Sequence, residues 1–333
     1  MIPGLAPFRV LRPAAVAAAI AAFRAEAGSR YLAGGTDLLV SLRRGLGQPP
    51  VLIDLAGIAE LGVLGVSSQG TRIGSGVTLA RLAASTEIHA RYPAVAQAAA
   101  AIASPGLRNL ATVGGNLLLE TRCIYYNQSE WWRRANGYCL KHGGELCHVA
   151  PQGQRCHAAF SGDLAAALLA LEAEIVIAAD SGQRRVPLAA LYADDGRAHL
   201  RLGPGEILTA VELPARTLAS AYAKVRVRAA TDFPLAGVAV ALEAPNATLA
   251  TLRIAVTGTN PRPFVLAGTD ELLGAGLDDR ALSKLGKLVQ KQVQPMRTTL
   301  AAANYRRLAA AALVNRLARG LYYGSNPQLR QPQ

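Results

Sequence analysis

The sequence predicts an α+β protein of more than one domain, and three observations lead to this fold class. The chain has 333 residues, 51% hydrophobic and 17% charged, so it can form two or three cores. Strand-like and helix-like runs follow one another through its first part without a repeat. Near Pro214 the composition changes, and strands followed by helices beyond it indicate a separate α+β domain.

The N-terminal segment predicts a short helix over residues 14–23. Two arginines precede this apolar run, as they do in a signal peptide. However, Pro13 suits a first helical turn, Glu26 lies within the segment and Gly28 suits the residue after a helix. We therefore expect a cytoplasmic protein. No apolar run approaches the about 18–20 residues of a membrane span, so no membrane association is expected.

Turn signals and periodicity predict the other elements. In the first part, strands are expected at 30–33, 51–54, 62–66, 71–74, 174–179, 184–186 and 207–213, with a hairpin joining 62–66 to 71–74. Helices are expected at 79–84, 94–102 and 164–171. In the second part, strands at 221–228, 237–242 and 252–257 predict an antiparallel sheet, and helices follow at 279–292 and 301–319.

The chain is basic, with 35 Lys and Arg against 22 Asp and Glu and a net charge of +13. From Arg280 to the C-terminus there are ten basic residues and no acidic ones. They recur at helical spacing, as in Lys284, Lys287, Lys291, Arg306, Arg307, Arg316 and Arg319. We interpret them as a solvated helix face or a contact face for a partner protein, and we expect no nucleic-acid binding.

Two pairs of glycines are candidate ligand-binding turns. Gly34-Gly35 follows a predicted strand, and Gly114-Gly115 repeats the pattern some eighty residues later. Paired glycines let the backbone turn tightly and approach a ligand, and their N–H groups form a concave nest for anionic oxygens. Together with Thr36 and Thr112, the two turns predict a diphosphate site; the alternative is two ordinary turns. The glycine fingerprints of Rossmann and P-loop proteins are absent.

All four cysteines lie within 34 residues, in a segment that also holds both tryptophans and two histidines, His142 and His148, and is followed directly by His157. A cytoplasmic enzyme seldom keeps structural disulfides, and the C-x₂₋₄-C pairs typical of zinc sites are absent. A [4Fe–4S] cluster also takes four thiolates, and its ligand spacing is looser. Spacing alone leaves an iron–sulfur cluster, zinc, or disulfides and free thiols as alternatives for Cys123, Cys139, Cys147 and Cys156.

The two Gly-Gly segments, AGGTD at 33–37 and TVGGN at 112–116, resemble the FAD-diphosphate loops of the flavoprotein subunits of molybdenum hydroxylases, the xanthine dehydrogenase family. The resemblance covers nearly the whole chain. In most members the second loop runs closely into a Ser-x-Asp-Leu helix start, which 161–164 resembles here. An insertion at 120–159, which contains all four cysteines, separates the two.

That insertion is similar to the one in β subunits of 4-hydroxybenzoyl-CoA reductases, which carries an extra [4Fe–4S] cluster. The specific runs are RCIYYNQSEWW at 122–132 and HVAPQG at 148–153. The resemblance implies an FAD-binding domain over 1–215, in two subdomains split near residue 57, with an iron–sulfur insertion at 120–159. A C-terminal domain of three antiparallel strands and helices would cover 216–333.

The resemblance also implies roles for single residues. The four cysteines would ligate the cluster, and FAD would be bound by Ala33, Gly34, Gly35, Thr36, Asp37, Ile102, Ala111, Thr112, Val113, Gly114, Gly115, Asn116, Asp163, Leu208 and Lys224. Four of these have simple alternatives. Asp163 could cap a helix, Ile102 and Leu208 could belong to the core, and Lys224 could lie on a solvated strand edge.

By this resemblance the chain is an electron-transfer subunit. Its partners would be a molybdenum-cofactor subunit and a small [2Fe–2S] subunit, in a dimer of heterotrimers. Reduced ferredoxin would be the electron donor, and the reaction would be dehydroxylation of 4-hydroxybenzoyl-CoA to benzoyl-CoA. The alternatives are a flavin subunit of another molybdenum enzyme acting on a different aromatic substrate, and a binding module held together by zinc.

Overall fold

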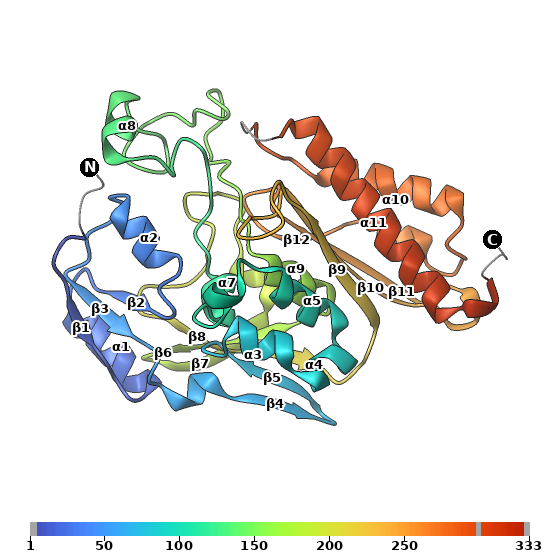
Figure 1. Cartoon of the computed structure of the whole chain (residues 1–333), viewed down its shortest axis with the longest axis horizontal. Coiled ribbons are helices and arrows are strands. Elements are labelled where there is room, and N and C mark those ends of the chain that lie inside the picture. Colours follow the sequence, from blue (N-terminus) through green and yellow to red (C-terminus); the bar gives the residue numbers. More distant parts are fainter. Residues whose placement is uncertain (1–4, 298–300, 330–333) are drawn as a thin grey trace.

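The computed structural model describes residues 5–297 and 301–329 and arranges them in three β-sheets with helices between them (Figure 1). The N-terminal sheet is parallel and has the strand order β1–β3–β2. Its strands and their connecting helices are β1 (Arg9–Leu11), α1 (Val16–Ala25), β2 (Arg30–Leu32), α2 (Leu38–Arg43) and β3 (Val51–Asp54). Parallel neighbours require such crossover helices, and α1 buries Ala19 and Ile20 in a core shared with Ile53.

The central sheet has five strands in the order β4–β5–β8–β6–β7, and every neighbouring pair is antiparallel. The strands are β4 (Leu64–Ser67), β5 (Gly70–Gly74), β6 (Glu174–Ala179), β7 (Gly182–Pro187) and β8 (Ile207–Pro214). The expected hairpin is confirmed, as β4 and β5 join through Ser68 and Gln69. Besides α8, which is described below, six α-helices belong to this part of the chain: α3 (Leu79–Ala84), α4 (Thr86–Arg91), α5 (Pro93–Ala101), α6 (Pro105–Arg108), α7 (Val113–Leu117) and α9 (Asp163–Ala170).

The C-terminal sheet lies between two layers of helices. Its strands are β9 (Ala219–Val225), β10 (Ala236–Glu243), β11 (Thr251–Thr257) and β12 (Phe264–Val265). Along β10, Val238, Val240 and Leu242 share a core with α10 (Asp279–Gln292) and α11 (Ala303–Ser325). The alternate residues Ala239 and Ala241 face α5 and α9. Small side chains on this second face let the alanine-rich helices approach the sheet.

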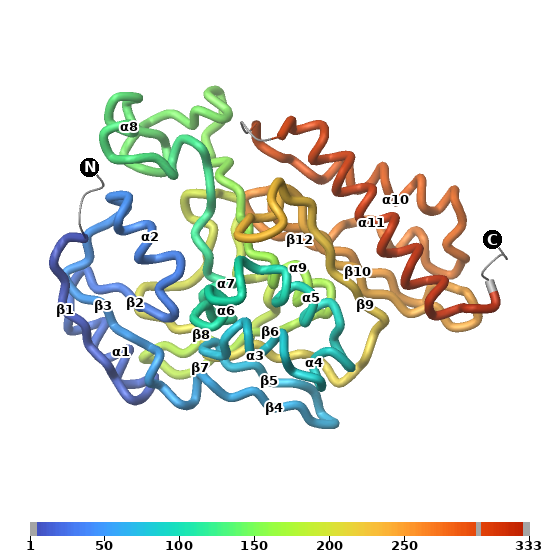
Figure 2. The backbone as a smooth tube through the Cα atoms, in the orientation of Figure 1, coloured from blue at the N-terminus to red at the C-terminus, as the bar shows by residue number. Residues whose placement is uncertain are grey.

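Residues 120–159 form a loop that leaves this part of the fold and returns to the same place; in Figure 2 it is the green projection carrying α8 (Glu130–Ala135). Its two ends pair with each other, because the backbone N–H of Arg122 donates to Ala159 and the N–H of Ala159 donates to Arg122, at 2.7 and 2.8 Å. The buried Arg133 side chain joins α8 to the turn after α2, donating to the carbonyl oxygens of Arg44 and Gly45 at 3.0 and 3.3 Å.

Three expectations are wrong. The C-terminal sheet has four strands, because the two-residue β12 pairs with β11 and is too short to leave a pattern in the sequence. Arg306 does not lie on a solvated face: it is buried and donates to the carbonyl oxygens of Leu235 and Met296 at 2.8 and 3.2 Å. The helix expected to end at residue 319 continues to Ser325.

No helix of the described residues combines the length and the apolar character that crossing a membrane requires.

Candidate functional site

A cleft of about 1180 Å³ lies between the N-terminal sheet and the central sheet and reaches the turn before β10. It collects segments that are far apart in the sequence. Both Gly-Gly turns line it, as do Ile102, Asp163 and Leu208, and the loop from Thr231 to Phe233 completes the wall. The cleft is large enough for a dinucleotide-sized ligand.

The first Gly-Gly turn packs directly against the segment that leads into the second. At Gly34 an added Cβ would lie 1.8 Å from the carbonyl oxygen of Leu110, so only glycine fits there. Gly35 has a φ of +69°, a conformation that side chains rarely adopt. The first turn and the segment that leads into the second are therefore in direct contact, and both line the same cleft.

The second Gly-Gly turn is the first turn of the short helix α7. The hydroxyl of Thr112 accepts a hydrogen bond from the N–H of Gly115 at 3.1 Å, which caps the helix. Gly114 lies against Ser75, whose Cβ would be 2.8 Å from an added Cβ. Asn116 accepts from the N–H of Leu164 at 3.1 Å and so fixes the turn relative to α9.

A buried ion pair lies at the start of α9, where Asp163 lines the cleft. The Lys224 ammonium donates to Asp163 at 2.9 Å, and the Tyr222 hydroxyl donates to the same oxygen at 2.5 Å. Burial raises the pKa of Asp163, while Lys224 and Tyr222 act in the opposite direction. Two simple alternatives are therefore wrong: Asp163 makes no cap hydrogen bond to α9, and the Lys224 side chain is only 3% exposed.

Thirteen of the fifteen residues expected at an FAD site line this cleft. Val113 and Lys224 do not; Val113 is buried in the core, and Lys224 contacts two residues that line the cleft, Asp163 and Asp232. Ile102 and Leu208 line the cleft and are core residues as well, so the core interpretation is confirmed and their contact with a flavin stays a prediction.

Two further residues that line the cleft, Arg122 and Phe233, were not predicted from the sequence. Arg122, at the start of the insertion, forms an ion pair with Asp37 of the first turn. The Arg122 guanidinium also lies 5.1 Å from the ring centre of Phe233. All three residues line the cleft. They belong to distant segments, and the only available signal was the position of Arg122 next to the first cysteine.

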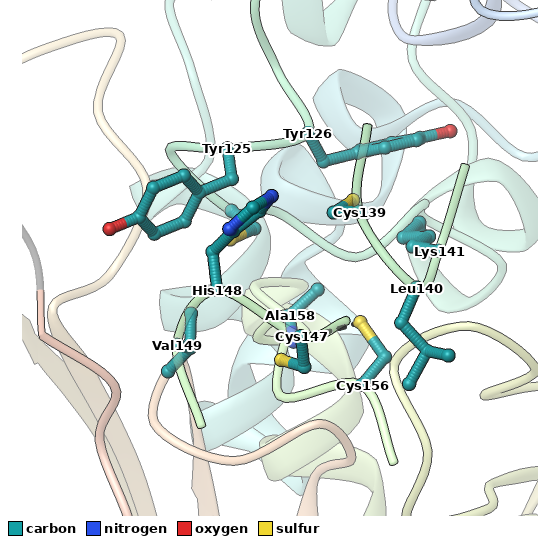
Figure 3. A pocket seen from close by; sticks show the side chains of 11 residues that line it. Tyr125, Tyr126, Cys139, Leu140, Lys141, Cys147, His148, Val149, Cys156 and Ala158 are labelled. Atoms are coloured by element: carbon teal, nitrogen blue, oxygen red, sulfur yellow. Dashed lines mark hydrogen bonds between the residues drawn. The ribbon is translucent and has the colours of Figure 1, made fainter. Parts of the chain in front are cut away.

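The four cysteines line a second, smaller cavity inside the insertion (Figure 3). Figure 3 shows the side chains of Cys139, Cys147 and Cys156 entering one space from different parts of the loop. None of the four forms a disulfide, and Cys139, Cys147 and Cys156 are buried. Tyr125, Tyr126 and His148 form part of the wall, whereas Trp131 is 76% exposed and shields nothing.

The thiols occupy an apolar environment. Burial raises the pKa of Cys123 and raises that of Cys156 to about 11, so both bare thiols are protonated at neutral pH. His148 is held by a contact of 2.6 Å between its Nε2 and the carbonyl oxygen of Tyr138. Among the described residues, no three His, Cys, Asp or Glu side chains are grouped closely enough to hold a single metal ion.

Comparison with known proteins identifies the family. Residues 6–216 match the FAD binding domain in molybdopterin dehydrogenase, and residues 220–321 match the CO dehydrogenase flavoprotein C-terminal domain. The chain is 33% identical over 259 residues to the aldehyde oxidoreductase FAD-binding subunit PaoB of Escherichia coli, covering 75% of this chain and 80% of that protein. It is 27% identical over 321 residues to the carbon monoxide dehydrogenase medium chain of Afipia carboxidovorans, covering 95% and 96%.

The fold agrees with these matches. A crystal structure of the Cu,Mo-CO dehydrogenase in its cyanide-inactivated form superposes with a TM-score of 0.78 at 25% identity, covering 97% of this chain and 99% of that one. The chain therefore belongs to the FAD-binding subunits of the molybdenum hydroxylase family.

Proposed function

We propose that this chain is the electron-transfer subunit of a molybdenum enzyme, that it binds FAD in the cleft between the Gly-Gly turns, and that its four cysteines hold a [4Fe–4S] cluster. One observation carries the proposal. A cleft of dinucleotide size and a cavity lined by four cysteines lie side by side, and Tyr126 lines both. Two redox groups in these places would be neighbours, as electron transfer requires.

The cleft residues fit FAD. The backbone around Gly34, Gly35, Gly114 and Gly115 can approach a diphosphate closely, and its N–H groups supply donors without a cationic side chain. Ile102 and Leu208 offer apolar surface to the flavin ring. Asp163 lines the cleft, and its side chain is held in place by contact with the Lys224 ammonium. Bound FAD would supply one- and two-electron chemistry, and the protein would orient it and exclude water.

The donor set of the cysteine cavity suits a cluster. A [4Fe–4S] cluster takes four thiolate ligands. All four cysteines of the chain line this one cavity. No disulfide competes for the thiols.

The proposal extends to partners and to the reaction. A molybdenum-cofactor subunit and a small [2Fe–2S] subunit would complete the enzyme as a dimer of heterotrimers, a heterohexamer, with ferredoxin as the electron donor. The insertion favours reductive dehydroxylation of 4-hydroxybenzoyl-CoA. The 33% identity to an aldehyde oxidoreductase subunit favours aldehyde oxidation as a second candidate. In both candidate reactions, the substrate would react on the molybdenum-cofactor subunit.

The test is anaerobic purification of the complete complex, with flavin, iron, sulfide and molybdenum measured for the wild type and for Cys123→Ser and Cys156→Ser. We expect one FAD per chain in all three proteins. The two variants should lose about four irons per copy of this chain. Stoichiometric zinc, or iron content unchanged by both substitutions, would contradict the cluster. Assays with 4-hydroxybenzoyl-CoA and with aromatic aldehydes separate the two reactions.

A further inference from the structure

An ion pair is built into the wall that separates the two cavities. The Lys141 ammonium donates to the Glu120 carboxylate at 2.6 Å. Lys141 lines the cysteine cavity and not the cleft, whereas Glu120 lines the cleft and not the cysteine cavity. Tyr126, which lines both, is the neutral part of the same wall. The pair is thus oriented, with its positive end toward the cysteines and its negative end toward the flavin site.

The positive end is fixed in place. The Lys141 side chain is only 4% exposed. Besides Glu120, its ammonium donates to the carbonyl oxygen of Gly196 at 2.6 Å and to the Thr121 hydroxyl. It also lies 4.7 Å from the centre of the Tyr126 ring, and Figure 3 shows it on the cavity side of that ring. Three acceptors and an aromatic face leave this cation no freedom to turn away.

The negative end is fixed as well. The N–H of Thr121 donates to the same Glu120 oxygen at 3.0 Å. A second titratable neighbour is His199, whose Nδ1 lies 3.9 Å from that oxygen. The His199 Nε2 donates to the carbonyl oxygen of Leu119 at 3.0 Å, and burial lowers the pKa of His199, so the imidazole stays neutral. Lys141 is therefore the cation that faces Glu120 across the wall.

Such a pair acts on two redox groups in opposite directions. A nearby cation favours the form of a redox group that carries the extra electron, and a nearby anion disfavours it. Inside a protein these effects exceed those between exposed charges, because neither water nor salt screens them fully. A cation beside the cysteines raises the reduction potential of the group they hold, and an anion beside the flavin lowers the flavin potential.

We infer that Lys141 and Glu120 are positioning residues that set the potentials of the two redox groups relative to each other. This inference rests on the proposed function, since it requires a redox group in each cavity. When the cysteine-held group is the stronger reductant, the ion pair brings the two potentials closer together. Electron exchange across the Tyr126 wall then runs readily in either direction.

The test is a potentiometric titration of the purified complex, with the cluster followed by electron paramagnetic resonance and the flavin by absorbance. Lys141→Met removes the charge and keeps the stem, whereas Lys141→Arg keeps the charge and is the matched control. We expect Lys141→Met to lower the cluster potential by at least a tenfold change in its redox equilibrium, which is about 59 mV for one electron. Lys141→Arg should restore the wild-type value.

Glu120→Gln supplies an independent test on the other side of the wall. We expect it to raise the flavin potential, and it keeps the inference falsifiable if Lys141→Met does not fold. Suppose that the variants hold their full flavin and iron and both potentials stay at the wild-type values. This result would overturn the inference about the ion pair and leave the proposed function standing. A wild-type complex without iron would instead contradict the proposed function.

Discussion

At the scale of single residues, the glycines show what a sequence can and cannot reveal. Gly34-Gly35 and Gly114-Gly115 are visible as a repeated pattern, because tight turns need glycine and leave it in the sequence. What they touch is not visible, since the clash that excludes a side chain at Gly34 comes from Leu110. The same limit applies to Asp163, whose lysine partner is 61 residues away.

The close approach at Gly34 predicts the effect of adding one methyl group. In Gly34→Ala the new Cβ would meet the carbonyl oxygen of Leu110 at 1.8 Å, so the two walls of the cleft must move apart. We expect a loss of about 1–3 kcal/mol in the free energy of unfolding. We also expect at least tenfold weaker FAD binding, which is about 1.4 kcal/mol. Flavin content and thermal unfolding measure both.

The control is Gly106→Ala, because an added Cβ at Gly106 meets nothing within 4 Å. It should bind FAD as the wild type does. A Gly34→Ala protein with full flavin content and an unchanged melting temperature would show that the contact between Gly34 and Leu110 is not rigid.

At the scale of elements, periodicity predicts the long, amphipathic segments well. The helix expected at 279–292 is α10, and the strands expected at 51–54 and 174–179 are β3 and β6. The helices and strands that were not predicted have six residues or fewer. They are β1, α2, α4, α6, α7, α8 and β12. Their positions depend on partners elsewhere in the chain, and such brief runs carry no period of their own.

The Arg133 side chain joins helix α8 to the turn after α2, which predicts a local effect of its removal. Arg133→Met leaves the carbonyl oxygens of Arg44 and Gly45 without their charged donor. Hydrogen bonds to charged groups contribute about 1.5–3 kcal/mol. We expect faster proteolysis within residues 120–159 and a lower melting temperature. Limited proteolysis followed by mass spectrometry locates the cleavage.

The matched control is on the same helix. The Arg134 side chain is 73% exposed, and its nearest contact with Glu130 is 3.7 Å. Arg134→Met should be cut no faster than the wild type. Equal proteolysis of the two variants would mean that Arg133 does not anchor the insertion.

At the scale of the whole molecule, the candidate sites combine local and distant information. The four cysteines are recognisable because they are close in sequence, and the structure gathers them around one cavity. The pairs Arg122–Asp37 and Lys141–Glu120 join segments 85 and 21 residues apart, and they exist only after the chain has folded. Charge counting could not distinguish them from the many arginines on the surface.

The cleft predicts how FAD contributes to stability. Its walls come from the N-terminal sheet, from α7, from β8 and from the turn before β10, so unfolding of any of these segments destroys the site. A ligand that binds only the folded chain at 100 times its dissociation constant stabilises it by about 2.7 kcal/mol. We expect flavin removal to lower the melting temperature by several degrees and added FAD to restore it. A melting temperature independent of FAD would contradict the assigned cleft.

The paired ends of the cysteine loop have a practical consequence. Because the backbones of Arg122 and Ala159 are hydrogen-bonded to each other, the chain leaves the rest of the fold and returns to it at one place. The same junction offers protein engineers a place to remove or transplant the cysteine loop as a unit.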